Sequence, residues 1–250
     1  MFESLETPCL ILDRQRLQRN ADAMLVRTAE LGVSLRPHLK TSKSDRVAAI
    51  AKAGKKSRIT VSTIKEAEYF AGAGYTDILL AVGITPNKFA RVAALSRSMR
   101  EPLLLVIDST AMAHQISEYA TRENIEMAVL VEIDCGEHRS GLPADDSVVV
   151  EIAQILNDCP NTACRGVMTH GGHSYNTAQR AQVVAVAEAE RRAAIEAAQH
   201  IQQAGYECPV ISVGSTPTVM WAEQLAGVTE VRCGIYLFWD LAQLSRHVCT

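Results

Sequence analysis

The amino-acid sequence predicts a parallel (β/α)8 barrel of the TIM type, preceded by an extra strand and helix. Three observations support this. Short apolar segments alternate with amphipathic ones throughout the 250 residues, as is typical of βα units. Eight such units follow the opening strand and helix, which is the number that closes a barrel, and the chain length suits one barrel. A doubly wound open sheet is the alternative, because periodicity does not show whether a sheet closes.

The elements are predicted from apolar runs, capping residues and glycine stops. The opening strand is predicted over 7–13, and Asp13 should cap a helix over 14–30. The eight strands of the barrel are predicted at 33–39, 58–62, 77–82, 103–107, 127–133, 166–169, 210–213 and 229–235. Helices are predicted at about 42–53, 65–73, 109–122, 145–156 and 177–204. Another helix should begin at 86, and a helical turn or two should lie within 238–244.

Composition excludes several classes of function. The net charge is −3 with no block of like charges, which argues against nucleic-acid or anionic membrane partners. Residues 1–6 carry two acids and no base, unlike a signal peptide, and no apolar run approaches the length of a spanning helix. The seven cysteines contain no CxxC pair, so we expect neither a disulfide framework nor a zinc site, and a cytoplasmic location.

Lys40 has the most unusual predicted position in the chain. It closes the strand over 33–39, inside the segment Arg36-Pro37-His38-Leu39-Lys40-Thr41. A buried ammonium is costly unless it is paired, deprotonated or covalently used, and a desolvated lysine forms Schiff bases with carbonyl compounds and pyridoxal phosphate. His38, two residues earlier, should share its face of the strand. The alternatives are a lysine that reaches solvent from the strand end and an ordinary core histidine.

A phosphate site is expected after the last two strands. Gly214-Ser215-Thr216-Pro217 follows the seventh strand and opens a helix, where hydroxyls and backbone amides can hold an anion. Gly234, Ile235 and Tyr236 follow the eighth strand, and barrels commonly bind phosphate between these two loops. Gly234 would let the backbone approach, and Tyr236 would offer a hydroxyl. The alternative is an ordinary helix cap.

Polar residues also follow other predicted strands. Ser62 follows the second strand, Arg139 lies beyond the fifth, and His170, His173 and Tyr175 follow the sixth. In a barrel all of them lie at the carboxyl ends of the strands, where active sites are found. The two histidines could bind a metal, but the glycines between them indicate a loop and no carboxylate is close in sequence. Contact with a cofactor or substrate is the favoured interpretation.

Together these motifs resemble the fold-type III pyridoxal-phosphate enzymes, and most closely the D-threonine aldolase and D-serine dehydratase group. The lysine strand is the most specific motif. The segment from Asp134 to Gly141 resembles the alanine racemase loop whose arginine, here Arg139, approaches the phenolic oxygen of the cofactor. The resemblance implies that Lys40 is catalytic and carries pyridoxal 5'-phosphate. The other residues expected at the cofactor are His38, Ser62, Arg139, His170, Tyr175, Gly214, Ser215, Thr216, Gly234, Ile235 and Tyr236, with His173 at the substrate.

The resemblance implies a lyase that acts on 3-hydroxy-D-amino acids, by retro-aldol cleavage or by β-elimination. Alternatives are a non-catalytic pyridoxal-phosphate-binding barrel, an amino-acid racemase, and a Schiff-base aldolase without pyridoxal. The phosphate site argues against the last of these, unless its substrate is itself a phosphate ester. Relatives in this group carry a C-terminal β-domain with ligands for a divalent metal. We therefore expect 1–250 to be one barrel domain, a truncated form without metal ligands of its own. A D-amino acid is the expected partner, and a homodimer is allowed.

Overall fold

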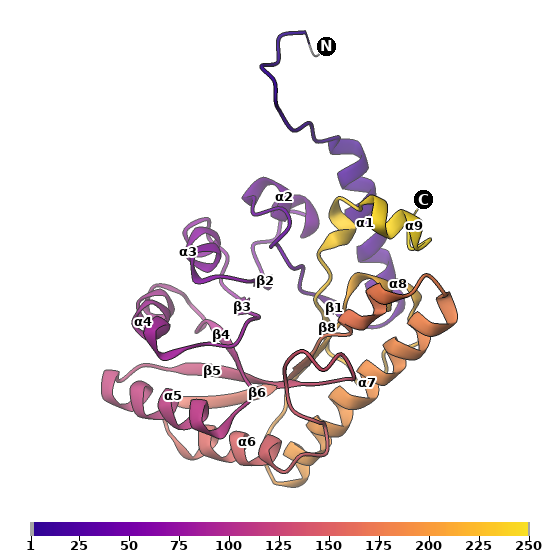
Figure 1. Ribbon diagram of the computed structural model, residues 1–250. Coiled ribbons are helices and arrows are strands. Elements are labelled where there is room, and N and C mark those ends of the chain that lie inside the picture. The colour runs from indigo at the N-terminus through magenta and orange to yellow at the C-terminus, as the bar shows by residue number, and fades with distance from the viewer. Residues whose placement is uncertain (1–2, 250) are drawn as a thin grey trace.

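A computed structural model describes residues 3–249. Its strands form one eight-stranded sheet in the order β1-β8-β7-β6-β5-β4-β3-β2 (Figure 1). Every paired neighbour in the sheet is parallel. The strands are β1 Ser34–Leu35, β2 Ile59–Val61, β3 Ile78–Leu80, β4 Leu104–Ile107, β5 Met127–Ile133, β6 Thr162–Thr169, β7 Val210–Val213 and β8 Glu230–Val231.

The two ends of this sheet meet, so the sheet closes into a barrel. His38, just beyond β1, forms a parallel bridge with Thr60 in β2. The Leu39 amide donates to the carbonyl of Thr60 at 2.9 Å, and the Thr60 amide donates to the carbonyl of Pro37 at 2.9 Å. The predicted barrel is therefore confirmed, and the open doubly wound sheet is excluded.

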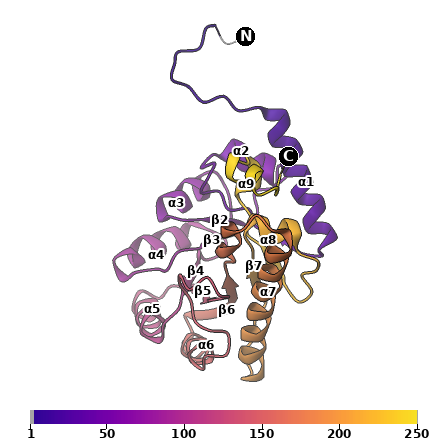
Figure 2. The same ribbon diagram turned by 45° about the vertical axis from the view of Figure 1, so that its right-hand side comes forward.

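Helices cover the outside of the barrel (Figures 1 and 2). The predicted cap of the first one is confirmed, because the Asp13 carboxylate accepts from the amides of Gln15 and Arg16. The α-helices are α1 Arg14–Glu30, α2 Asp45–Ala51, α3 Ile64–Gly72, α4 Phe89–Ser98, α5 Thr110–Glu123, α6 Val148–Asp158, α7 Arg180–Gln203, α8 Thr216–Trp221 and α9 Leu241–Ser245. Short 3-10 turns are η1 Pro86–Lys88, η2 Gly172–Asn176 and η3 Ile235–Leu237.

The alternation of side chains along each strand divides the core in two. Leu105 and Val129 belong to the large cluster between the strands and the helices. A small separate cluster consists of Leu79, Leu104, Val106, Ala128, Leu130 and Met168. Its members from one strand are two residues apart, so they share the face that points into the barrel. Continuing that face leads from Leu130 to Glu132 and from Met168 to His170. The spacing that fills the barrel thus also sets which side chains emerge at its carboxyl end.

The strand predicted over 7–13 is wrong. These residues are exposed, Leu10 completely, and they join no strand of the described chain. Figure 1 shows this segment leading away from the barrel. Each barrel strand already has a neighbour on both sides, so the closed sheet offers no free edge for another strand to pair with.

The segment around the lysine is less regular than predicted. Only 34–35 of the predicted 33–39 form a ladder, partly because Pro37 has no amide hydrogen to donate. The following helix begins at Asp45, where Ser44 caps it, so Lys40 lies in a turn between strand and helix. Within 3–249 no helix has the length and apolar character needed to cross a membrane.

Candidate active site

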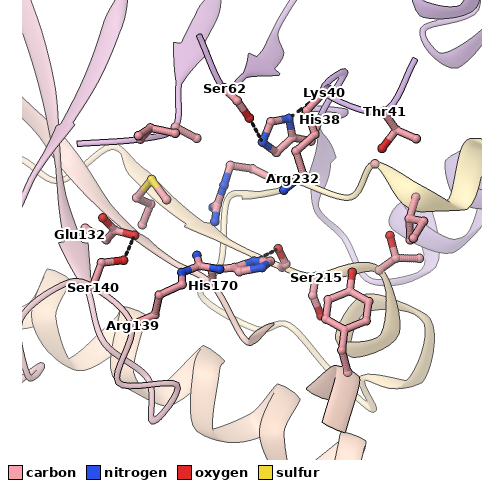
Figure 3. A pocket seen from close by; sticks show the side chains of 18 of the residues that line it. His38, Lys40, Thr41, Ser62, Glu132, Arg139, Ser140, His170, Ser215 and Arg232 are labelled. Atoms are coloured by element: carbon pink, nitrogen blue, oxygen red, sulfur yellow. Dashed lines mark hydrogen bonds between the residues drawn. The ribbon is translucent and has the colours of Figure 1, made fainter. Parts of the chain in front are cut away.

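A cavity of about 560 Å³ opens at the carboxyl ends of the strands (Figure 3). The predicted site residues that line it are His38, Lys40, Ser62, Arg139, His170, Tyr175, Gly214, Ser215, Thr216, Gly234 and Ile235. The rest of the wall includes Thr41, Asp108, Glu132, Ser140, Met168 and Arg232. His173 and Tyr236, which were expected at the site, are not part of this wall.

Lys40 enters the cavity from the turn after β1. Its backbone N–H donates to Nδ1 of His38 at 3.4 Å, and His38 Nε2 lies 3.5 Å from Oγ of Ser62 (Figure 3). Although Lys40 is open to the cavity, the barrel around it desolvates the amine. This burial, together with the charges of Arg139 and Arg232, lowers its pKa. The unprotonated amine, which is the nucleophilic form, is thereby favoured.

Two uncharged imidazoles accompany the lysine. Burial, with the nearby charges of Lys40 and Arg232, holds the pKa of His38 well below its ordinary value. Burial and the charges of Arg232 and Arg139 lower the pKa of His170 to about 3. His170 Nδ1 lies 3.2 Å from the carbonyl oxygen of Gly214. Because a carbonyl only accepts, the His170 proton resides on Nδ1, and Nε2 keeps a free lone pair.

Arg139 is carried by a loop after β5 whose shape depends on Asp134 and Gly141. One oxygen of Asp134 accepts from the amides of Gly136 and His138 at 2.9 and 3.0 Å. Gly141 has φ +93°, and a Cβ there would lie 2.8 Å from the amide nitrogen of Asp134. The aspartate and glycine positions of the sequence motif therefore build the loop that places Arg139 at the cavity wall.

Ser215 and Thr216 at the start of α8 have different surroundings. Oγ of Ser215 already lies 2.9 Å from Oγ of Ser174 and 3.0 Å from Oγ1 of Thr218. Ser215 and Thr218 also form a capping box at the helix start. Oγ1 of Thr216 is buried and has no hydrogen-bond partner within 3–249. Buried hydroxyls are normally paired, so Thr216 is the group best placed to receive an anion in the cavity.

Gly234 is needed because two strand ends approach each other closely. A Cβ at this position would lie 2.4 Å from the carbonyl oxygen of His38, which any larger residue would displace. The next residues, Ile235 and Tyr236, begin η3. Tyr236 is completely buried in the core and its hydroxyl has no partner within 3–249. Tyr236 does not line the cavity, and its expected contact with the cofactor stays a prediction.

His173 lies beside the loop after β5 instead of at the cavity wall. Its ring atoms Cε1 and Nε2 are 3.9 Å from where a Cβ of Gly136 would stand. Its Nδ1 is buried without a hydrogen-bond partner in the described chain. Tyr175 does reach the cavity, and burial raises the pKa of its phenol to about 12. His173 therefore lies outside the cavity wall, and its contact with a substrate stays a prediction.

Arg232 is a site residue that was missed in the sequence. It is buried, donates from Nη1 to Oγ of Ser212 at 2.7 Å and also donates to the carbonyl of Thr169. Figure 3 shows its guanidinium among the labelled side chains of the cavity. Its signal was present in the register of β8, because Arg232 follows Glu230 by two residues on the face that points into the barrel.

No cluster of three or more His, Cys, Asp or Glu side chains suited to a metal occurs within 3–249. The cavity instead combines one amine, two guanidinium groups, two neutral imidazoles and a free hydroxyl. This donor set suits an anionic organic molecule that carries a carbonyl group.

Residues 12–241 match the sequence profile of the family described as alanine racemase, N-terminal domain. D-threo-3-hydroxyaspartate dehydratase from Delftia sp. is 44% identical over 98% of this chain and 64% of its own length. D-serine dehydratase from Dictyostelium discoideum is 30% identical over 99% of this chain and 66% of its own length. D-threonine aldolase from Arthrobacter sp. is 28% identical over 94% of this chain and 62% of its own length. The chain therefore spans less than two thirds of the Delftia and Arthrobacter relatives.

Solved structures show the same similarity. The Delftia dehydratase superposes with a TM-score of 0.95 over 99% of this chain and 65% of that one, at 44% identity. Alanine racemase from Clostridium difficile has a TM-score of 0.73 over 90% of this chain and 60% of its own, at 19% identity, which shows a shared fold alone.

Proposed function

This chain belongs to the alanine racemase N-terminal domain family, and on that premise we propose that it is a pyridoxal-phosphate-dependent lyase acting on 3-hydroxy-D-amino acids. One observation carries the proposal. The same cavity holds a desolvated lysine, Lys40, and a buried hydroxyl without a protein partner, on Thr216. An amine and an anion-binding hydroxyl are what a phosphate ester with an aldehyde group requires. The residues present therefore fit the cofactor.

Each cavity residue has a distinct part in this proposal. Lys40 would hold the cofactor covalently through its amine, and Thr216 would bind the phosphate. Arg139 and Arg232 would supply positive charge to anionic groups of the cofactor or substrate. His170, uncharged and with a free Nε2 lone pair, can accept a hydrogen bond. When bound, the cofactor supplies an electron sink for bond cleavage at the substrate α-carbon, and the protein selects the bond by orientation.

Between the two lyase reactions, β-elimination has the stronger support. The relative at 44% identity is a dehydratase, as is the Dictyostelium relative at 30%. The aldolases among the relatives are 28 to 30% identical to this chain. We therefore propose a dehydratase, with D-threo-3-hydroxyaspartate and D-serine as the first substrates to examine.

The test begins with the visible spectrum of the purified protein after incubation with pyridoxal phosphate. Borohydride reduction and peptide mapping should then place the pyridoxyl mass on Lys40. A panel of D-threonine, D-serine and D-threo-3-hydroxyaspartate, with and without divalent metal, should release ammonia and a 2-oxo acid. Glycine with an aldehyde as products would instead identify an aldolase. Label on Lys43 or Lys65, or no label, would contradict the proposal.

A further inference from the structure

Glu190 is a buried carboxylate that does not line the cavity but contacts the loops behind it. It lies on α7, the long helix that covers β6 and β7, and is 1% exposed. An isolated buried carboxylate is strongly unfavourable, so its hydrogen bonds must compensate for lost hydration. The identity of its partners indicates what it does.

All four of its described partners belong to the ends of β6 and β7 or to the helix that follows. Oε1 accepts from the amides of Gly171 at 2.7 Å and Gly214 at 2.9 Å, and from Oγ1 of Thr169 at 3.2 Å. Oε2 accepts from Oγ1 of Thr218 at 3.0 Å. One side chain therefore connects two loops that are far apart in sequence.

These partners are next to the residues that line the cavity. Thr169 and Gly171 flank His170 in the chain, and Gly214 precedes Ser215 and Thr216. Thr218 Oγ1 also accepts from the Ser215 amide at 3.0 Å, so the carboxylate reaches the first turn of α8 through that hydroxyl. By bonding the residues next to His170 and Thr216, Glu190 restricts the backbone conformation that orients these two side chains.

Glu190 also decides which groups remain for an anion. A glycine amide after the seventh strand of a barrel is a natural phosphate donor, but the Gly214 amide is already used by Oε1. Thr216 Oγ1 keeps no protein partner in the described chain. A carboxylate behind an anion site repels the anion, although its charge also favours the charged form of the buried Arg232 guanidinium. What Glu190 contributes to the anion site itself is the geometry of its hydrogen bonds.

We propose that Glu190 is the positioning residue of the phosphate site. It acts by accepting hydrogen bonds that fix the loops after β6 and β7, which presents Thr216 to the cofactor phosphate. This inference rests on the proposed function, because it requires pyridoxal phosphate as the ligand. The inference predicts that tight binding of pyridoxal phosphate requires the acceptor oxygen Oε1 of residue 190 and does not require its negative charge.

The experiment compares Glu190→Met, which keeps the length but removes the acceptors, with Glu190→Gln, which keeps one acceptor and removes the charge. Glu196→Gln is the matched control, because it makes the same chemical change at an exposed position of the same helix. Two probes are titrated into each protein, pyridoxal phosphate and 5′-deoxypyridoxal, which has the ring and aldehyde but no phosphate. The phosphorus NMR shift of bound cofactor reports the phosphate surroundings directly.

Glu190→Met should weaken pyridoxal phosphate affinity by about tenfold or more, since it leaves two backbone amides without an acceptor. The affinity for 5′-deoxypyridoxal should change by less than about threefold in the same variant. Glu190→Gln should bind pyridoxal phosphate as tightly as the unchanged protein, or more tightly. Glu196→Gln should match the unchanged protein with both probes.

Equal loss of both probes in Glu190→Met would overturn the inference, because a general loss of packing would explain it. Unchanged phosphate affinity would overturn it as well. If Glu190→Met does not fold, Gly171→Ala replaces it, because its added Cβ would lie 3.0 Å from Oε2 of Glu190. This variant should show the same selective loss of affinity for pyridoxal phosphate. Failure of the unchanged protein to bind pyridoxal phosphate would overturn the proposed function itself, and this inference with it.

Discussion

The neighbouring hydroxyls of Ser215 and Thr216 at the start of α8 differ in whether they already have hydrogen-bond partners. The Ser215 hydroxyl is occupied by Ser174 and Thr218, whereas the Thr216 hydroxyl has no partner in the described chain. Adjacent residues of similar chemistry therefore have separable roles. Ser215 caps the helix start, and under the proposed function Thr216 is the residue that would bind the phosphate.

Thr216→Val should weaken pyridoxal phosphate binding without a comparable loss of stability. The lost hydrogen bond to a charged group is worth about 1.5–3 kcal/mol. Ser215→Ala should instead lower the free energy of unfolding by about 1 kcal/mol, as expected for a lost helix cap, and change affinity little. Cofactor titration and urea unfolding of both variants measure the two effects. The reverse pattern would show that Ser215 is the phosphate ligand.

The partly buried imidazole of His170 should make stability depend on pH. Its pKa is lowered to about 3 from an ordinary 6.5, mainly by burial. Between these values the unfolded chain binds more protons, so the stabilisation is complete above about pH 6.5 and is lost as the pH falls toward 3. At pH 5 the loss is about 2 kcal/mol at most. Urea unfolding at pH 7 and 5 should show a smaller loss for His170→Asn, and equal losses would contradict this origin.

At the scale of elements, the contact between β6 and β7 depends on a glycine. The pairing of β5 with β6 shifts register between Val129 and Leu130. Gly166, paired with Leu130 at this shift, has φ +134°. A Cβ on Gly166 would lie 1.9 Å from the carbonyl oxygen of Val210 in β7. Only glycine lets β6, which leads to His170, and β7, which leads to Gly214, approach this closely.

Gly166→Ala should therefore destabilise the protein by about 3 kcal/mol or more, the size expected for a severe backbone clash. Gly72→Ala is the matched control, because nothing lies within 4 Å of its added Cβ at the end of α3. That substitution should stabilise the protein by about 0.5–1 kcal/mol through helix propensity. Thermal or urea unfolding compares the two. A mild effect of Gly166→Ala would mean that β7 moves aside easily.

At the scale of the whole molecule, a buried ion network ties the closing strands together. Arg36, two residues before His38, donates from Nε to Glu230 at 2.7 Å and from Nη1 to Asp77 at 2.5 Å. Glu230 also accepts from Ser212 at 2.8 Å, and Ser212 accepts from Arg232 at 2.7 Å. The arginine of the lysine motif thus holds the barrel together below the site instead of lining the cavity.

Arg36→Leu should destabilise the barrel by about 3–5 kcal/mol, because it leaves Glu230 buried without its shortest partner. Arg91→Leu, which removes an exposed pair with Glu68, should cost about 1 kcal/mol or less. Chemical denaturation of both variants provides the measurement. If adding Glu230→Gln restores the stability of Arg36→Leu, the unpaired charge of Glu230 causes the destabilisation. Similar small effects of both arginines would show that Arg58, 3.5 Å from Glu230, compensates for Arg36.

Local patterns in the sequence determined most of the fold. Strands β5 and β7 and helix α1 have the predicted bounds, because apolar runs, caps and glycine stops act over a few residues. Lys40, Arg139 and Thr216 were also placed at one end of the barrel by a general rule, since residues that follow parallel strands meet at their carboxyl ends. These conclusions needed only chain order and side-chain chemistry.

Only the tertiary structure decided the contacts between segments distant in sequence. The bridge from His38 to Thr60 that closes the barrel depends on how all eight strands pack together, as does the missing edge that leaves 7–13 unpaired. The same holds for Glu190, whose partners lie 19 to 28 residues away. In sequence it is one acid among others on a long helix. Its burial, and hence its hydrogen bonds, exist only once the helix packs behind the loops after β6 and β7.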